Sequence, residues 1–492
     1  MLLWFRNDLR VHDNPALLYF LQHREAEHNR ALFFVSKAQW QSHDDADIKI
    51  DLMLRHVNLL SQQLVKYGIT LTVVECDTFA QQIDYLQSYC QKNHNAAIIV
   101  NQEVEYNEVE RDRQLRLLGL NLVSFEADVI VPKGQVLNLH NEMYKVFTPF
   151  KKAWIKKVKQ QGFDYIPKYA LDQFESNKLE NTAKCQPQKT DIELIVTDAS
   201  SDAWPLIDTV EANVIPDFLA DKLEHYADTR DIPSIKGTSG LSPYLAIGAL
   251  SPRYVLTLLM HKHPDLLHAS DSKTFVWLNE LIWREFYRHL LYHFPRLCKG
   301  KNFNEKYNSL QWLNNQEQFL AWCQGKTGYP IVDAAMLQLN QTGWMHNRLR
   351  MIVASFLTKH LLIDWRWGEQ YFKSRLIDGD LAANNGGWQW AASTGCDAQP
   401  YFRIFNPIRQ SENFDPKGIF IRKYLPMLND VPNKEIHFPH KYIAKLAAPV
   451  ADLLAEKPSE NASKKLAMNE YWPAIVDHKA ARERALACYK QV

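Results

Sequence analysis

The first 130 residues alternate between short apolar runs and longer amphipathic stretches. The runs are typical of buried strands and lie at 2–5, 31–35, 70–75, 96–100 and 121–125. The stretches between them have helical spacing and lie at 46–66, 78–93 and 107–117. Parallel strands need crossovers of a dozen or more residues, so this alternation predicts an α/β domain with a mainly parallel sheet.

The predicted α/β domain lacks the glycine signatures of ordinary nucleotide sites. No G-x-G-x-x-G follows its first strand, and Gly325-Lys326-Thr327 lacks the upstream glycine of a Walker motif. A conventional dinucleotide or ATP site is therefore not expected.

The remainder of the chain divides by pattern. Residues 165–205 are polar and irregular, and the pattern becomes helical from about 206. The stretches 272–294 and 344–362 are long and rich in Leu, Ile and Trp. We expect an α/β domain, a linker, a large all-α domain and a short C-terminal tail, with limits at 1–131, 132–204, 205–476 and 477–492.

Composition narrows the class of protein. Lys and Arg number 57 against 56 Asp and Glu, a net charge of +1, which excludes a globally basic nucleic-acid binder but allows a local basic face. No apolar run is long enough to span a bilayer, and the apolar start ends too early for a signal peptide. The seven cysteines are scattered without metal or redox spacing, which favours a reduced, cytoplasmic protein without disulfides.

Metal and hydrolase hypotheses find little support. His289 and His293 have a spacing that can bind zinc, but no H-E-x-x-H motif accompanies them and packing explains them better. The segment 237–240 is not the G-x-S-x-G elbow of a serine hydrolase. We expect no metal site.

Nine of the 14 tryptophans lie between 277 and 390, and some have charged or amide side chains close by in the sequence. In the segment 277–287, Trp277, Glu280, Trp283 and Arg284 share one helical face. One interpretation is a surface Glu–Arg pair flanked by core aromatic residues. The alternative is a pair of aromatic walls with one carboxyl group, which suits a nucleobase extruded from a duplex.

Two further segments add to this pattern. Asn347 and Met351 are one helical turn apart and would line the same surface. In the segment 378–393, small residues around Asn384 allow close backbone approach to a flat ligand. Trp388 and Trp390 are two residues apart, so they must point in different directions on a helix.

Together these segments closely resemble the photolyase/cryptochrome family, specifically the bacterial class I cyclobutane pyrimidine dimer photolyases that carry a folate antenna. The resemblance covers nearly the whole chain, from about 3 to 476. The residues that carry it are 3–14, 277–287, 325–336, 344–351 and 378–390.

The resemblance implies a Rossmann-like antenna domain at 1–131 and a helical, FAD- and DNA-binding catalytic domain at 205–476. Gly240 stands where many close relatives have Arg, so a side-chain phosphate contact is not expected there. The FAD residues implied by the motifs are Tyr226, Thr238, Ser239, Gly240, Leu241, Ser242, Trp277, Glu280, Arg284, Asn347, Arg350, Asp378, Gly379, Asp380 and Asn384.

The resemblance further implies light-driven splitting of cyclobutane dimers in DNA by fully reduced, anionic FAD. The implied lesion pocket consists of Glu280, Trp283, Asn347, Met351 and Trp390. The (6-4) photolyases carry His at the Asn347 and Met351 positions, and DASH cryptochromes usually carry Tyr at the Trp390 position. The cyclobutane lesion is therefore expected.

Three other groups are implied in the same way. Trp388, Trp365 and Trp312 match an electron-transfer chain that runs from the flavin to the surface. A 5,10-methenyltetrahydrofolate antenna would be held by His43, Asn107, Glu108, Cys298 and Lys299. Arg230, Arg348 and Arg403 would meet DNA phosphates.

The repair enzyme is expected to act as a monomer, without an obligate protein partner or membrane. A blue-light signalling cryptochrome is the alternative, although that role usually goes with a long C-terminal extension. A plain flavin oxidoreductase would turn over a nicotinamide substrate in darkness, and the sequence offers no nicotinamide motif.

Overall fold

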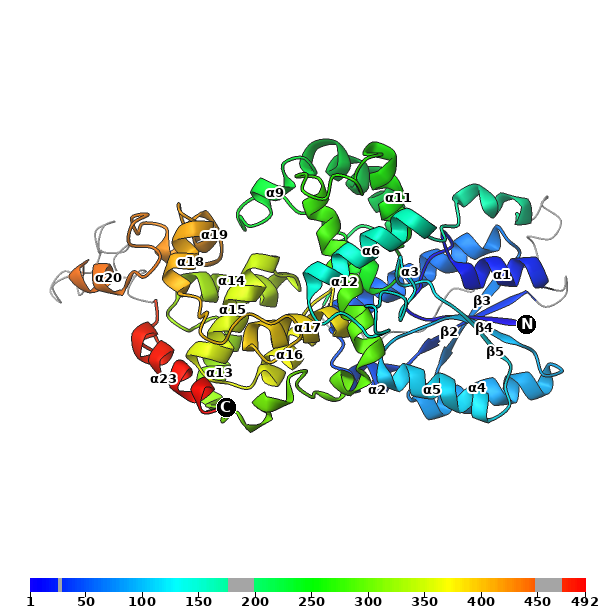
Figure 1. The fold of residues 1–492 in the computed structure, drawn as a ribbon, viewed down its shortest axis with the longest axis horizontal. Coiled ribbons are helices and arrows are strands. Elements are labelled where there is room, and N and C mark those ends of the chain that lie inside the picture. The colour runs from blue at the N-terminus through cyan, green and yellow to red at the C-terminus, as the bar shows by residue number, and fades with distance from the viewer. Residues whose placement is uncertain (25–28, 176–198, 447–470) are drawn as a thin grey trace, which may run out of the picture. The chain divides into compact units, whose positions relative to one another are not determined.

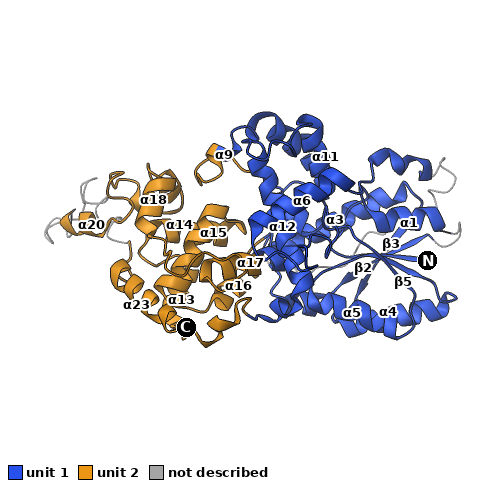
Figure 2. Cartoon of the chain, viewed as in Figure 1, with its two compact units in different colours: residues 1–227, 239–301, 377–383 blue, residues 228–238, 302–376, 384–492 orange. Residues whose placement is uncertain are grey.

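The computed structural model describes residues 1–24, 29–175, 199–446 and 471–492. Its contacts divide the chain into two compact units (Figure 2). Unit 1 contains residues 1–227, 239–301 and 377–383, and unit 2 contains residues 228–238, 302–376 and 384–492.

Unit 1 contains a parallel five-stranded sheet with the order β3-β2-β1-β4-β5. Its strands are β1 Leu2–Phe5, β2 Arg30–Val35, β3 Thr70–Glu75, β4 Ile98–Asn101 and β5 Leu122–Phe125. The predicted α/β class is confirmed, and each predicted strand lies within two residues of an observed one. β1 and β4 are buried at every position because helices cover both faces of the sheet (Figure 1).

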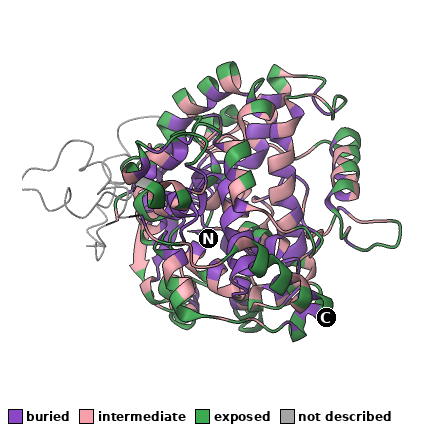
Figure 3. Cartoon of the chain, turned by 90° about the vertical axis from the view of Figure 1, so that its left-hand side faces the viewer, coloured by how far each residue is buried: buried purple, intermediate pink, exposed green. Residues whose placement is uncertain are grey.

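The helices around the sheet follow the predicted amphipathic stretches and add two short helices. They are α1 Pro15–His23, α2 Lys37–Ser42, α3 Asp47–Val65, α4 Phe79–Lys92 and α5 Tyr106–Leu117. On one face of the sheet, Leu86 of α4 and Leu115 of α5 join Trp4 and Ile98 in a buried cluster. Along individual helices, buried and exposed residues form separate stripes (Figure 3).

Unit 1 continues with helices beyond the sheet. They are α6 Phe147–Gln161, α7 Ile207–Thr209, α8 Ile215–Asp217, α9 Tyr226–Thr229, α10 Ser242–Ala246, α11 Pro252–Lys262 and α12 Phe275–His293. The last two residues of α9 count with unit 2. α6 lies inside the range predicted as linker, yet Phe150 and Trp154 on it are completely buried. The contact-based units also differ from the predicted domain ranges, since α12 belongs to unit 1. The predicted limits themselves stay predictions.

In its described residues, unit 2 is helical. Its helices are α13 Gln316–Cys323, α14 Pro330–Thr342, α15 Asn347–Ser355, α16 Trp365–Lys373, α17 Leu381–Ala392, α18 Pro407–Phe414, α19 Ile419–Tyr424, α20 His440–Leu446 and α23 His478–Lys490. The first three residues of α17 count with unit 1. A single large apolar cluster includes Trp322, Trp365 and Trp388.

The C-terminal segment predicted as a tail, residues 477–492, contains helix α23. Ala485 and Tyr489 of this helix are buried against Tyr307 and Leu310. Among the described helices, none combines the length and the apolarity that crossing a bilayer requires. The six cysteines that the structure describes are unbridged, and Cys185 lies outside the described residues.

Candidate functional site

Helix α12 in unit 1 has one half-buried stripe on an otherwise buried stretch. Glu280, Trp283, Arg284 and Tyr287 are half-buried, and every residue between them is buried. Their i, i+3, i+4, i+7 spacing places them on one helical face. The predicted carboxyl group therefore lies in line with the predicted aromatic wall, on the side of the helix that a ligand could reach.

The predicted residues Trp277 and Tyr226 lie on two sides of a third aromatic ring. Trp277 is more buried than the stripe and packs against Phe218, with ring centroids 5.3 Å apart. Tyr226 meets the same phenyl ring edge-on at 6.1 Å. Phe218 thus joins two residues predicted to hold the flavin, although the sequence motifs do not include it.

Two arginines of α12 are held by half-buried carboxylates of unit 1. Arg284 donates to the backbone oxygen of Asp128 at 2.6 Å and pairs with its carboxylate. Arg288 pairs with Asp128 at 2.8 Å and with Asp380 at 2.7 Å. Burial alone would raise the pKa of Asp128, but the two arginines lower it to about 2. Arg284 and Asp380 are therefore linked through two residues that the motifs do not name.

The turn 238–242 carries the donors expected of a phosphate site. Ser242 Oγ donates to Asp378 at 2.7 Å, which joins the turn to the 378–380 segment within unit 1. Gly240 has φ +68°, a left-handed conformation that a side chain such as Arg would strain. No described backbone oxygen accepts from the N–H groups of residues 238–241. These N–H groups and the nearby hydroxyls are available to an anionic ligand.

In unit 2, α15 begins at Asn347, with His346 as its N-cap. Asn347 is exposed and Met351 is half-buried one turn later, so they share a face as predicted. Arg350 Nε donates to the backbone oxygen of Met345 at 2.8 Å. Burial lowers the pKa of His346 to about 4, so its ring is neutral and accepts the hydrogen bond that begins the helix.

Helix α17 has an open face and a buried face. Asn384 and Trp390 are half-buried, and Gly387 between them is exposed. Trp388 is buried on the other side, as the two-residue spacing predicts. Asn384 Nδ2 donates to the backbone oxygen of Glu369 at 2.9 Å, which fixes the amide and leaves its oxygen as an acceptor.

The three tryptophans predicted to transfer electrons all lie in unit 2. Trp388 and Trp365 are buried and Trp312 is half-buried, which matches an inside-to-surface order. A Cβ atom on Gly368 would come within 2.1 Å of the Trp388 ring, so only glycine permits this packing. Trp365 Nε1 donates to Asn302 Oδ1 at 2.9 Å.

The predicted phosphate contacts differ in their surroundings. Arg403 is exposed. Arg348 pairs with Asp231 at 2.9 Å and lies 4.4 Å from the ring centre of Phe414. Arg230 lies 3.9 Å from the same carboxylate. DNA phosphate would therefore compete with Asp231 for two of the three arginines.

Comparison with known proteins decides the family. Residues 1–168 match the family model described as DNA photolyase, and residues 277–491 match the FAD binding domain of DNA photolyase. The chain is 43% identical to the deoxyribodipyrimidine photo-lyase of Escherichia coli, over 99% of this chain and 98% of the relative. This chain belongs to the DNA photolyase family. The enzyme of the same name from Vibrio cholerae is 44% identical, with 99% of each chain covered.

Solved structures of the family share the fold. A bacterial class III photolyase from Agrobacterium tumefaciens is 35% identical, with a TM-score of 0.75, covering 100% of this chain and 97% of the other. A cryptochrome from Synechocystis is 26% identical, with a TM-score of 0.77 and coverage of 99% and 98%. An archaeal photolyase from Sulfolobus tokodaii, described with two FAD molecules, is 27% identical, with a TM-score of 0.71 and coverage of 100% and 99%.

The class I photolyase assignment and FAD binding are thus established. The chemistry of the predicted flavin segments fits the dinucleotide. The open N–H groups of residues 238–241 suit its phosphates, and the amide oxygen of Asn384 suits a ring N–H. The individual FAD, lesion and electron-transfer residues stay predictions.

The five predicted antenna residues lie around the start of α5 in unit 1, where we call them the antenna cluster. His43 Nε2 lies 3.0 Å from Asn107 Nδ2, and His43 Nδ1 lies 3.5 Å from Glu108 Oε1. The Cys298 thiol hydrogen-bonds the backbone of Tyr106, and Lys299 Nζ lies 3.6 Å from the centre of the Tyr106 ring. Tyr106 thus connects the two predicted pairs.

Glu108 gives the antenna cluster an unmet hydrogen-bonding capacity. Its Oε2 atom is buried and has no described partner. Burial, together with Glu105 and Glu103, raises the pKa of Glu108 to about 8. A buried carboxyl group without a partner costs free energy, and a ligand with polar N–H groups would remove that cost.

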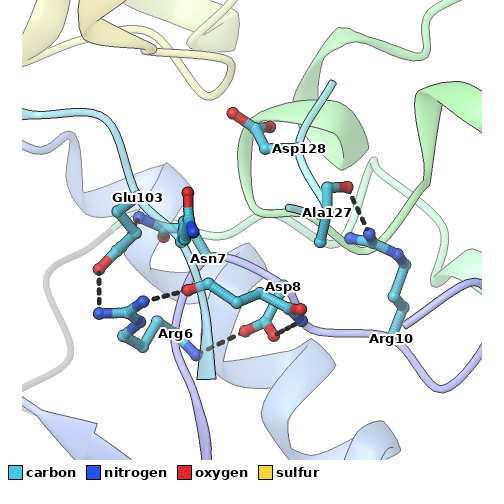
Figure 4. A pocket seen from close by; sticks show the side chains of 9 residues that line it. Arg6, Asn7, Asp8, Arg10, Glu103, Ala127 and Asp128 are labelled. Atoms are coloured by element: carbon cyan, nitrogen blue, oxygen red, sulfur yellow. Dashed lines mark hydrogen bonds and ion pairs between the residues drawn. The ribbon is translucent and has the colours of Figure 1, made fainter. Parts of the chain in front are cut away.

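A second polar pocket lies at the carboxyl edge of the sheet, between β1 and β4, and we call it the edge pocket (Figure 4). Arg6 pairs there with Glu103 at 3.2 Å and with Asp112 at 2.8 Å. Arg10 donates to the backbone oxygen of Ala127 at 2.8 Å. About 10 Å³ of space remains, enough for about one water molecule.

Several residues at these sites escaped the sequence analysis. Arg288 continues the i, i+4 series of Glu280 and Arg284, so helical spacing could have placed it there. Tyr106 is adjacent to the Asn107-Glu108 pair. Phe218 and Glu369 are distant in sequence from the motifs, and only tertiary structure reveals their contacts.

Proposed function

We propose that this chain uses light to split cyclobutane pyrimidine dimers in DNA into two pyrimidines, as a carbon–carbon lyase. The observation that supports it most is the half-buried stripe of α12, where Glu280 lies beside Trp283 and Arg284. The stripe lies in a chain that aligns over nearly its full length with relatives named deoxyribodipyrimidine photo-lyase.

The residues of the chain bind and orient the lesion. Trp283 and Trp390 each offer a flat apolar surface suited to a pyrimidine, and Met351 offers an adaptable one. The Glu280 carboxyl hydrogen-bonds the dimer and stabilises the negative charge that develops on it. When bound, FAD in its reduced form supplies the photoexcited electron for ring opening. Asn384 accepts a hydrogen bond from the flavin ring, since its own amide nitrogen is held by Glu369.

The tryptophan chain restores the reduced cofactor. With FAD bound, Trp388 would give up an electron first, Trp365 would refill it, and an external reductant would refill Trp312. The half-buried position of Trp312 supports it as the outer end, whereas burial does not order the other two, which are both fully buried. Replacing Trp388 with Phe should abolish photoreduction yet leave repair by chemically reduced enzyme intact, because repair returns its electron.

A second chromophore extends the range of useful light. We propose 5,10-methenyltetrahydrofolate at the antenna cluster, because Glu108 Oε2 lacks a partner and pterins carry N–H donors. The archaeal relative with two FAD molecules offers an alternative, a second flavin. The absorption spectrum of the purified protein separates the two, and a flavin-only spectrum after folate addition would exclude folate.

DNA is the proposed partner, with Arg230, Arg348 and Arg403 at its phosphates. We propose a monomer that acts in the cytoplasm without a protein partner. Because the chain has a net charge of only +1, these contacts must be local. The affinity for DNA should therefore fall as the salt concentration rises, with a slope set by these few arginines.

The test of the activity is repair of dimer-containing DNA in light and in darkness. Wild-type protein with fully reduced flavin should repair only in light. Glu280→Ala should repair about tenfold less per photon absorbed by its bound flavin, because the dimer loses the group that stabilises its developing negative charge. Trp344→Phe, at a residue we assign to packing, should repair normally. Unchanged dimers under light with reduced flavin would refute the proposal and favour a signalling role like that of cryptochromes.

A further inference from the structure

The Trp283 indole is covered on one face by a ring from outside the predicted site. Phe147, the first residue of α6, lies parallel to it, with centroids 3.7 Å apart and planes 5° apart. Phe147 is only 7% exposed, whereas Trp283 is half-buried. One face of the indole is therefore occupied by the chain itself, and the accessible part of the ring lies elsewhere.

The parallel geometry of the Phe147–Trp283 pair differs from that of the ring contacts that Phe286 makes beside it. Phe286 meets Phe147, Phe150 and Trp283 edge-on, with interplanar angles of 83°, 70° and 87°. Edge-to-face contacts are what aromatic quadrupoles favour, and superposed parallel rings are less favourable as a pair. Packing alone therefore does not explain why Phe147 and Trp283 lie flat on each other.

Helix α6 is anchored independently of this stack. Trp154 Nε1 donates to Glu285 Oε2 at 2.6 Å, and the same carboxyl group accepts from the backbone N–H groups of Ile130 and Val131. Phe150, one turn after Phe147, is completely buried against Phe286. These contacts fix α6 on α12, so Phe147 is held in place as a rigid support.

We propose that Phe147 is a positioning residue for the lesion wall: it clamps the Trp283 indole in one orientation before a pyrimidine dimer arrives. The inference rests on the proposed function, because the contact of Trp283 with the dimer is part of that proposal. An indole held flat loses no rotational freedom on binding, so the affinity for the dimer is higher than with a mobile ring.

The experiment compares dark binding of dimer-containing and undamaged DNA by the FAD-loaded full-length protein. Phe147→Leu keeps an apolar side chain but removes the flat ring. It should weaken dimer binding about threefold to tenfold, the size of an aromatic pair, and leave binding to undamaged DNA unchanged. Phe147→Tyr keeps the ring and should restore the wild-type preference for the dimer.

The matched control is Phe150→Leu on the same helix. It should lower the melting temperature without changing the preference for the dimer, because Phe150 does not contact Trp283 in the described ring pairs. Flavin absorbance verifies folding, and Phe147→Met serves if Phe147→Leu is insoluble. An unchanged preference in the aliphatic variants, or an equal loss in Phe150→Leu, would overturn the positioning role.

One further variant separates the two proposals. If Trp283→Ala weakens dimer binding and Phe147→Leu does not, only the positioning role fails. If Trp283→Ala also leaves dimer binding unchanged, the proposed lesion wall fails, and the role of Phe147 fails with it.

Discussion

The edge pocket and the antenna cluster lie in the same unit and differ in how their charges are satisfied. In the edge pocket, Arg6 is already paired with Asp112 and Glu103. In the antenna cluster, Glu108 has a buried oxygen without a described partner and a raised pKa. Open α/β sheets usually bind ligands at the edge where the strand order reverses. Here the sheet edge keeps one unpartnered donor, Arg6 Nε, whereas the antenna cluster keeps an unpartnered carboxyl oxygen, so the two sites differ in the kind of group they leave unpaired.

The largest effect should come from breaking the edge pocket. Arg6→Met leaves two buried carboxylates, Asp112 and Glu103, to share Arg111, so the cluster carries one uncompensated buried charge. We expect the free energy of unfolding to fall by about 3–5 kcal/mol, the usual cost of an orphaned buried charge. Chemical denaturation measures it. Arg113→Met, which removes an exposed pair with Glu110, should change the stability little. A small loss in Arg6→Met would mean that water enters the pocket freely.

The sequence predicted the sheet because buried parallel strands leave continuous apolar runs that end at polar turns. It also indicated that Trp388 and Trp390 point apart, since helical geometry alone determines that. It could not predict that Phe147 of α6 stacks on Trp283, because Phe147 lies inside the range 132–204 that we predicted as linker. Contacts between segments far apart in the chain depend on packing, and local pattern carries no signal of them.

The residues of the antenna cluster were implied by family resemblance, and their individual chemistry does not single them out. His43 is more than 60 residues from Asn107, and nothing in either local pattern pairs them. Tyr106, which touches both Cys298 and Lys299, looks like the first residue of an amphipathic helix. Such a site becomes visible only when a buried polar atom is found without a partner.

The second largest effect should come from Glu108→Gln, tested by titrating the purified protein with 5,10-methenyltetrahydrofolate. With a pKa of about 8, Glu108 is mostly protonated near neutral pH, and loss of a neutral hydrogen bond costs about 0.5–1.5 kcal/mol, so affinity should fall about twofold to tenfold. Flavin content and repair at wavelengths absorbed by flavin should stay unchanged. Normal folate affinity in this variant would mean that Glu108 does not contact the antenna.

The raised pKa of Glu108 predicts a pH dependence of stability. Its pKa is about 8 in the folded chain against an ordinary value of 4.5, so the folded state binds more protons between these two pH values. The contribution of Glu108 to stability should therefore fall as pH rises from about 4.5 to 8. Denaturation of wild type and Glu108→Gln at pH 5.5 and pH 8 measures the effect of Glu108 together with the neighbouring Glu105 and Glu103, whose charges act on it. The free energy of unfolding of Glu108→Gln, relative to that of the wild type, should be higher at pH 8 than at pH 5.5. The same difference at both pH values would contradict the prediction.

The smallest effect should come from Lys299→Met. Lys299 is exposed, and its ammonium group lies 3.6 Å from the centre of the Tyr106 ring. The contact with Tyr106 only positions the ammonium group, and an exposed ion pair with an anionic ligand is worth about 1 kcal/mol or less, so folate affinity should fall by no more than about fivefold. Lys301→Met, two residues further along the chain, controls for loss of charge near an anionic ligand.

If both variants lose folate affinity equally, Lys299 acts through its charge alone, and its contact with the Tyr106 ring does not affect binding. If only Lys299→Met loses affinity, the ring holds the ammonium group where the ligand needs it, and the difference between the antenna cluster and the edge pocket extends to their cations. In the cluster the cation rests on a neutral ring and keeps its charge for a ligand, whereas in the edge pocket Arg6 is neutralised by two carboxylates of its own chain.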